Sequence, residues 1–168
     1  MPKFAYSIAF AGICGALLAA PAGAQMKPAG HDDIASAINA CRAISSPTWI
    51  DLDALPGMGW RAAEKRGQRR TAEKIRGIYQ MRGNAAYLVI GHDQLEEKSC
   101  SILARLESTA AYTPLVQQLA SSQGMPTRQD GPTYFWETPD YSMVVEPSGE
   151  RNAPNMQITI KALKESAE

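Results

Sequence analysis

The chain has 168 residues, of which 45% are hydrophobic, and its 17 basic side chains balance its 17 acidic ones, so the formal net charge is zero. After residue 25 no apolar run is long enough to cross a bilayer. About 140 residues follow this point, which is the usual size of one domain. The mature protein is therefore expected to be one domain that does not span a membrane.

Residues 1–24 have the parts of a secretory signal peptide. Lys3 supplies a positive end, residues 4–20 form an apolar run, and Ala22 and Ala24 make an A-x-A cleavage site. We expect cleavage after Ala24 and a periplasmic or secreted location. The alternatives are an uncleaved membrane anchor and a lipoprotein, and the bulky residue before the leader's cysteine argues against the second.

Two cysteines, Cys41 and Cys100, remain after this leader. In an oxidising compartment an even pair is more often bridged than free, so we expect a disulfide bond. Its loop of about 60 residues is worth roughly 4 kcal/mol in the chain-entropy model. Two buried thiols are the alternative. The chain has no C-x-x-C pattern, so neither a redox motif nor a zinc site is expected.

The first half of the domain is expected to form a helix and then strands. A flexible segment, 25–32, precedes a helix over 33–45 whose apolar residues recur at spacings of three and four, with Asp32 or Asp33 as its N-cap. A turn-rich passage follows, anchored to the core by Trp49 and Trp60, and leads into a short strand over 58–63. The next two features are a hairpin, whose Gly83-Asn84 pair suits a two-residue turn, and a strand with one face formed by Cys100, Ile102, Ala104 and Leu106.

The second half repeats this order. A helix from Ser108 or Thr109 to Gln123 ends at Gly124, a loop covers 124–132, and the segments "TYFWE" and "YSMVVE" form another hairpin before an alternating strand over 156–162. The order helix, strands, helix, strands predicts an α+β domain over 33–163 with a mainly antiparallel sheet and two helices packed on one face. No internal repeat is evident in the sequence, and residues 164–168 are expected to fray.

Residues suited to catalysis are few. His31 precedes two aspartates where a helix starts, so capping is preferred to metal binding. His92 and Asp93 are adjacent on an expected strand end and would point to opposite faces. The usual hydrolase, zinc-protease and nucleotide-binding motifs are absent, so we expect no cofactor, no metal site and no enzymatic activity. The alternative is a small envelope hydrolase that uses His92 or a pair of carboxylates, drawn from Asp51, Asp53, Glu137, Asp140 and Glu146.

The most unusual stretch is basic. Residues 61–82 contain eight basic and two acidic side chains, a local charge of +6, whereas the rest of the mature chain sums to about −7. It forms a candidate surface for an anionic envelope component or an acidic protein surface, through Arg61, Lys65, Arg66, Arg69, Arg70, Lys74 and Arg76. Nucleic acid is not expected, because no stacking aromatics lie among the arginines. A solvated connection that protects a sheet edge explains the same composition without a partner.

A second candidate surface is aromatic. Tyr134 and Trp136 lie on one side of their expected strand, and Tyr141 follows across the turn. This side would form an exposed binding face if helices cover only the other side of the sheet, whereas cross-strand aromatic packing in the core is the alternative. The combined expectation is a small, disulfide-stabilised, non-catalytic binding domain of the bacterial envelope. A carrier that holds a small apolar ligand between the sheet and the helices is a further alternative.

Overall fold

The computed structural model describes residues 26–63, 75–91 and 98–163. Its helices are α1 (His31–Ile44) and α2 (Tyr112–Gln123), with two short 3-10 turns, η1 (Pro56–Met58) and η2 (Thr109–Ala111). The strands are β1 (Trp60–Ala62), β2 (Ile75–Met81), β3 (Ala86–Gly91), β4 (Cys100–Arg105), β5 (Arg128–Asp130), β6 (Thr133–Glu137), β7 (Tyr141–Glu150) and β8 (Ala153–Ala162).

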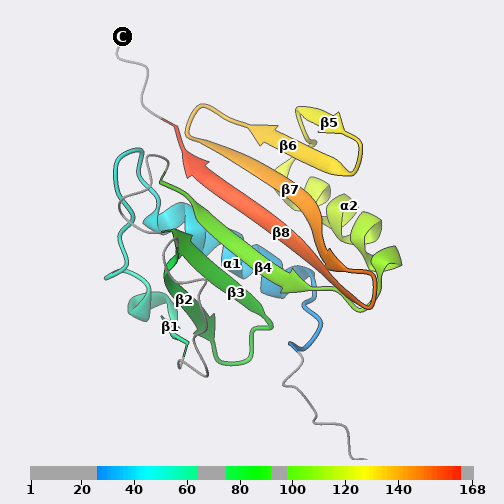
Figure 1. Ribbon diagram of the computed structural model, residues 1–168. Helices are drawn as coiled ribbons and strands as arrows, with labels where there is room; N and C mark the ends of the chain where they lie inside the picture. Colours follow the sequence, from blue (N-terminus) through cyan, green and yellow to red (C-terminus); the bar gives the residue numbers. More distant parts are fainter. Residues whose placement is uncertain (1–25, 64–74, 92–97, 164–168) are drawn as a thin grey trace, which may run out of the picture.

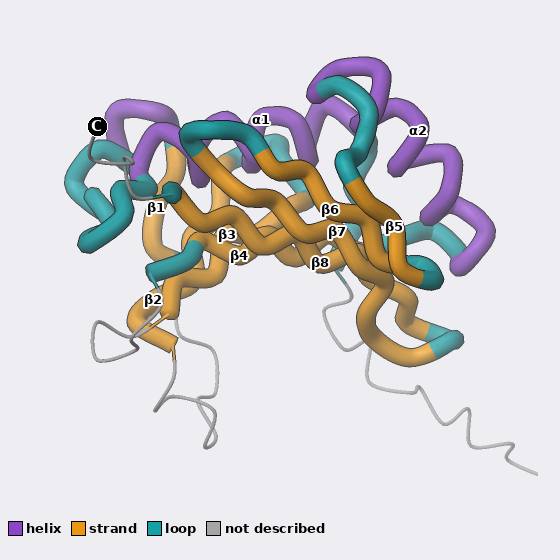
Figure 2. Tube along the Cα trace, turned by 90° about the horizontal axis from the view of Figure 1, so that it is seen from above, coloured by secondary structure: helices purple, strands orange, loops and turns teal. Residues whose placement is uncertain are grey.

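The strands form one antiparallel sheet in the order β1-β2-β3-β4-β8-β7-β6-β5. Both helices pack on the same face of it (Figures 1 and 2), which confirms the predicted α+β fold. Each half of the chain is a helix followed by four antiparallel strands, and the halves meet where β4 pairs with β8. This repeat exists in the topology although the sequence shows none.

Buried and partly exposed residues alternate strictly along the central strands, and the buried ones form the core. In β3, β4 and β8, every second residue is buried against the helices, and these residues include Leu88, Ile102 and Ile158. Burying one aliphatic side chain of this size is worth about 1.5–3 kcal/mol, so the covered face supplies most of the stability of the sheet. No helix in the described part of the chain combines the length and the apolar character needed to cross a bilayer.

The predicted disulfide bond joins Cys41 in α1 to Cys100 at the start of β4, with 5.5 Å between their Cα atoms. Both residues are fully buried. As expected, α1 therefore lies across the face of the sheet that carries Cys100. A bridge of this kind points to an oxidising, extracytoplasmic compartment.

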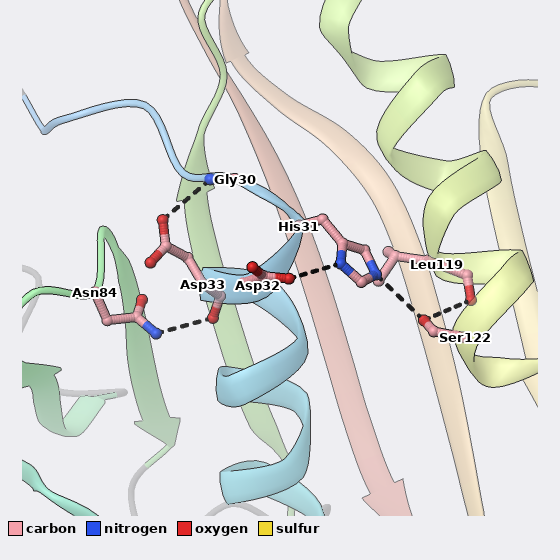
Figure 3. Close-up of polar contacts among 7 residues, drawn as sticks. All are labelled: Gly30, His31, Asp32, Asp33, Asn84, Leu119 and Ser122. Atoms are coloured by element: carbon pink, nitrogen blue, oxygen red, sulfur yellow. Dashed lines mark hydrogen bonds and ion pairs between the residues drawn. The ribbon is translucent and has the colours of Figure 1, made fainter.

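Helix α1 begins at His31, two residues before the predicted start, so its N-cap is Gly30 and not Asp32 or Asp33, and residues 31 and 32 belong to the helix and not to a flexible segment. The Asp33 carboxylate accepts a hydrogen bond from the Gly30 backbone N–H at 3.0 Å, which satisfies a donor that the helix itself cannot use. The backbone carbonyl of Asp33 in turn accepts from the Asn84 amide at 3.0 Å. The first turn of α1 is thus tied to the β2–β3 connection, as Figure 3 shows.

Three further local predictions need correction. The β2–β3 hairpin is present, but its turn is centred on Arg82 and Gly83, because the Asn84 N–H bonds to the Met81 carbonyl and Gly83 has a φ of 86°. The expected loop 124–132 contains strand β5, which pairs with β6 across a tight Gly131 turn. Trp60 is buried as expected, whereas Trp49 is 56% exposed and anchors nothing in the core.

Reduction of the Cys41–Cys100 bond should lower the free energy of unfolding by roughly 4 kcal/mol, because it releases a loop spanning 59 residues in the unfolded chain. Urea denaturation with and without a phosphine reductant measures this difference. The double variant Cys41→Ala, Cys100→Ala is the control and should not respond to the reductant. An unchanged midpoint for the reduced natural protein would contradict the prediction.

The two tryptophans of the turn-rich passage provide a matched pair. Trp60→Ala should cost about 3–5 kcal/mol, because it opens a cavity in the core. Trp49→Ala should change the unfolding free energy by no more than about 0.5 kcal/mol, because its side chain is largely in water. Thermal denaturation followed by circular dichroism distinguishes them, and equal losses would show that the passage packs differently.

Candidate functional site

The sheet face opposite the helices carries a continuous row of side chains. The strand registers place one residue from each of seven strands in this row: Ile78, Val89, Ser101, Thr159, Val144, Phe135 and Arg128. We call these seven residues the open-face row. Figure 2 shows that β2 and the turn between β7 and β8 extend away from the helices, so the open face is concave between them, whereas β5 and β6 stay beside α2.

The open-face row is polar in the middle, is apolar on both sides of this middle, and ends in a charged residue, Arg128, at β5. The Ser101 and Thr159 hydroxyls lie 3.4 Å apart across β4 and β8. At one end the Arg128 guanidinium stacks 3.6 Å from the centre of the Phe135 ring. At the other end Ile78 is 42% exposed, which makes it one of the most exposed large apolar side chains of the described chain. An apolar side chain so exposed on a strand is a candidate contact point for a partner.

Only two members of the predicted basic surface lie within the described residues. Arg61 on β1 pairs with Gln80, and both belong to the open face, in the row next to Ile78. Arg76 lies two residues before Ile78 on β2, and both arginine side chains are exposed. The other five members, Lys65, Arg66, Arg69, Arg70 and Lys74, lie outside the described residues. The two described arginines flank the exposed end of the open-face row.

The predicted aromatic surface is not exposed. Trp136 is 2% and Tyr141 is 8% exposed, and Tyr134 is half-buried against the same core. The alternation was correctly anticipated, but all three residues lie on the helix-covered face, with Tyr134 beside Tyr112 of α2 and Tyr141 under Arg42 of α1. The Trp136 indole donates to the Gly124 carbonyl at 2.7 Å, which fixes the chain leaving α2. Core packing, the alternative from the sequence, accounts for these rings.

A serine, a histidine and an aspartate meet where α1 starts and α2 ends (Figure 3). His31 Nδ1 lies 3.1 Å from Asp32 Oδ1, and His31 Nε2 lies 3.4 Å from Ser122 Oγ. The order of contacts matches that of a nucleophile, base and orienting acid. Nothing in the sequence indicates this meeting, because 91 residues separate His31 from Ser122.

The environment of these three residues argues against catalysis. The Asp32 side chain is fully exposed, so water screens it and leaves it free to rotate away from the imidazole. The Ser122 hydroxyl donates to the Leu119 carbonyl at 3.2 Å, which uses the proton that a base would remove. Neither of the two described pockets is lined by any of these residues. The contact between His31 and Ser122 is best explained as a polar clip between the helices.

The other residues of the hydrolase alternative are not brought together in a described site. Asp51 uses its carboxylate to accept from the Asp53 N–H at 3.1 Å, which is an ordinary turn. Glu137 and Glu146 lie near opposite ends of the β6–β7 hairpin, and His92 lies outside the described residues. Within the described ranges, no three His, Cys, Asp or Glu side chains are grouped to hold a metal ion.

Two half-open pockets lie at the margins of the helix-covered face. The first, of about 470 Å³, lies between the last turns of α1 and the ends of β7 and β8; the second, of about 420 Å³, lies between η2 and the β7–β8 turn. The buried side chains between helices and sheet form one packed cluster. An apolar carrier would need a cavity at that place, and neither described pocket provides one.

Comparison with known proteins identifies no relative: no family model, no curated protein sequence and no solved structure matches this chain.

The polar clip leads to a prediction about reactivity. A fluorophosphonate probe, which labels activated serines, should leave Ser122 unmodified when the labelled protein is analysed by peptide mass spectrometry. His31→Ala should lower the free energy of unfolding by about 0.5–1.5 kcal/mol through the lost hydrogen bond, with Ser122→Ala as the matched partner variant. Labelling of Ser122 that disappears in His31→Ala would instead demonstrate a catalytic serine.

Proposed function

We propose that this protein is an exported, non-catalytic binding domain that docks an acidic protein of the bacterial envelope on its concave open face, at the end formed by β1 and β2. The observation that carries the proposal is a sheet covered by helices on one face only, whose free face ends in an exposed isoleucine between two exposed arginines. Exposed apolar and arginine side chains are the kind of contacts that protein interfaces use.

Export is supported by two independent features. The leader over residues 1–24 has the composition of a secretory signal. The disulfide bond between α1 and β4 belongs in an oxidising compartment. Both agree with a periplasmic or secreted location for the binding activity.

The negative charge of the partner follows from the composition around Ile78. Arg61 and Arg76 are exposed on β1 and β2. The chain that connects these two strands, residues 64–74, adds five basic and two acidic side chains. A concentration of positive charge at one end of a face attracts an acidic partner and speeds encounter more than it strengthens the final complex.

A protein suits this face better than a membrane surface. A planar bilayer cannot lie flush against a concave sheet, whereas a rounded protein surface can. The open-face row also offers apolar and hydroxyl side chains beyond the basic end, and only a partner that reaches into the concavity would contact them. An anionic membrane would meet the arginines alone.

Site-specific photo-crosslinking tests this proposal. A benzophenone amino acid at position 78, in cells that export the protein, should give a discrete adduct with one protein. The same group at exposed Gln118 on α2 is the matched control and should give none. Once the partner is identified, Ile78→Glu should weaken its binding at least about tenfold, or by about 1.4 kcal/mol.

The two arginines should affect the salt dependence of partner binding, which is a different effect from that of Ile78. Arg61→Gln with Arg76→Gln should weaken binding at low salt, and the difference should shrink toward 1 M salt, where the Debye length is only about 3 Å. The variant Arg151→Gln, in the turn between β7 and β8, is the charge-matched control and should bind normally. Equal adducts from positions 78 and 118, or binding to anionic vesicles in place of a protein, would contradict the proposal.

A further inference from the structure

The pocket between α1 and the ends of β7 and β8 has opposite charges on its two walls. One wall is the last part of α1, with Asn39, Arg42, Ala43 and the C-cap residue Ser45; the other is Asp140 in the β6–β7 turn. Tyr141, Ile160 and Ala162 form an apolar floor. Its volume of about 470 Å³ is in the range of sites for small ligands, roughly 300–1,000 Å³.

The Arg42 side chain and the backbone turn that carries Asp140 are held in place by their surroundings. The Arg42 guanidinium stacks on the Tyr141 ring, 4.2 Å from its centre. The turn that carries Asp140 is fixed by Thr138, whose hydroxyl accepts from the Tyr141 N–H at 3.1 Å, and by a bond of 2.9 Å from the Leu163 N–H to the Asp140 carbonyl. A site that is formed before its ligand arrives loses less entropy on binding.

The two charges do not neutralise each other. No ion pair joins Arg42 to Asp140 in the described chain, although both line the same pocket. Arg42 in the last turn of α1 also offsets the helix dipole, but that role requires no carboxylate on the facing wall. An arginine and an aspartate on opposite walls are therefore available to a ligand that carries both a carboxylate and an ammonium group.

A third polar group in the wall lacks a partner. The Ser45 hydroxyl oxygen is buried and makes no hydrogen bond within the protein. Buried polar atoms are nearly always satisfied, so an unsatisfied one in a pocket wall points to a group supplied from outside. The carbonyl end of α1 beside it carries partial negative charge and favours a cation. An ammonium group beside Asp140 would suit this end of the helix, and a rotation of the Ser45 side chain would bring its hydroxyl into contact with that group.

We infer that this pocket binds a small zwitterion of the α-amino acid class. The Arg42 guanidinium takes the carboxylate, and Asp140 accepts from the ammonium group, joined by the Ser45 hydroxyl once that side chain rotates toward the pocket. An apolar or aromatic side chain of the ligand lies against Ala43 and Ala162 at the rim. This site lies on the helix-covered side of the sheet and is independent of the proposed protein-binding face.

Titration with L-phenylalanine and two neutralised analogues tests the inference. N-acetyl-L-phenylalanine lacks the ammonium charge and L-phenylalaninamide lacks the carboxylate. Backbone amide shifts in an ¹⁵N spectrum should saturate with L-phenylalanine and be confined to residues around the pocket. Each analogue should bind at least about tenfold more weakly than the zwitterion, since each leaves one charged wall unpaired.

Two variants assign the ends of the ligand. Arg42→Gln and Asp140→Asn should each weaken L-phenylalanine at least about tenfold. Arg42→Gln should leave L-phenylalaninamide unaffected, and Asp140→Asn should leave N-acetyl-L-phenylalanine unaffected. Both side chains are exposed, so the fold should persist, which the dispersion of the same spectra verifies; Asp32→Asn is the control.

The result that would overturn the inference is equally specific. No saturable shift at concentrations up to about 10 mM would exclude the site. Equal binding of all three compounds, or loss of binding in Asp32→Asn as well, would show that the charged walls do not select the ligand.

Discussion

The covalent bond between α1 and β4 is the constraint on which the rest of this structure depends. It joins the first helix to a strand beside the middle of an eight-stranded sheet, and both sulfur-bearing residues are completely buried. Helix α2 covers the other half of the same face without a covalent link: the Tyr112 hydroxyl donates to the Pro132 carbonyl at 2.7 Å, and burial raises the pKa of this phenol. The described part of the chain has only these two helices, and neither of them covers the opposite face of the sheet.

Much of this fold can be predicted from the sequence, because the alternation of apolar and polar residues along a strand can be recognised without knowing which segments pair. The residues of β4 and β8 alternate so regularly that their buried face could be assigned in advance, and the buried pair Cys41 and Cys100 then located α1. The face that helices cover at β6 could not be assigned in this way. Alternation separates Phe135 from Trp136, but only the docking of α2 decides that the tryptophan lies inside.

The errors and omissions share one physical cause, which is dependence on contacts between distant segments. Strand β5 has no hydrophobic pattern, and it exists because β6 offers it hydrogen bonds. Tryptophan is a large apolar residue of the kind expected in a core, yet the chain leaves the core after Ile44 and Trp49 is exposed. The pocket that brings Arg42 to Asp140 requires α1 to reach the start of β7, and the clip between His31 and Ser122 requires the two helices to be neighbours. Neither juxtaposition has a local sequence signal.

The pocket beside α1 and the open face lie on opposite sides of β7 and β8. Binding at one site could therefore change the affinity of the other only through these strands. Tyr141 lies in the pocket wall, and its neighbour Ser142 belongs to the open face. Energetic coupling would need an element with two arrangements that both ligands bias. Strands β7 and β8 pair continuously over ten residue pairs, and a one-residue slip would turn the buried Met143 and Ile160 into solvent. The register is thus held by the core, and we expect the zwitterion and the protein partner to bind independently.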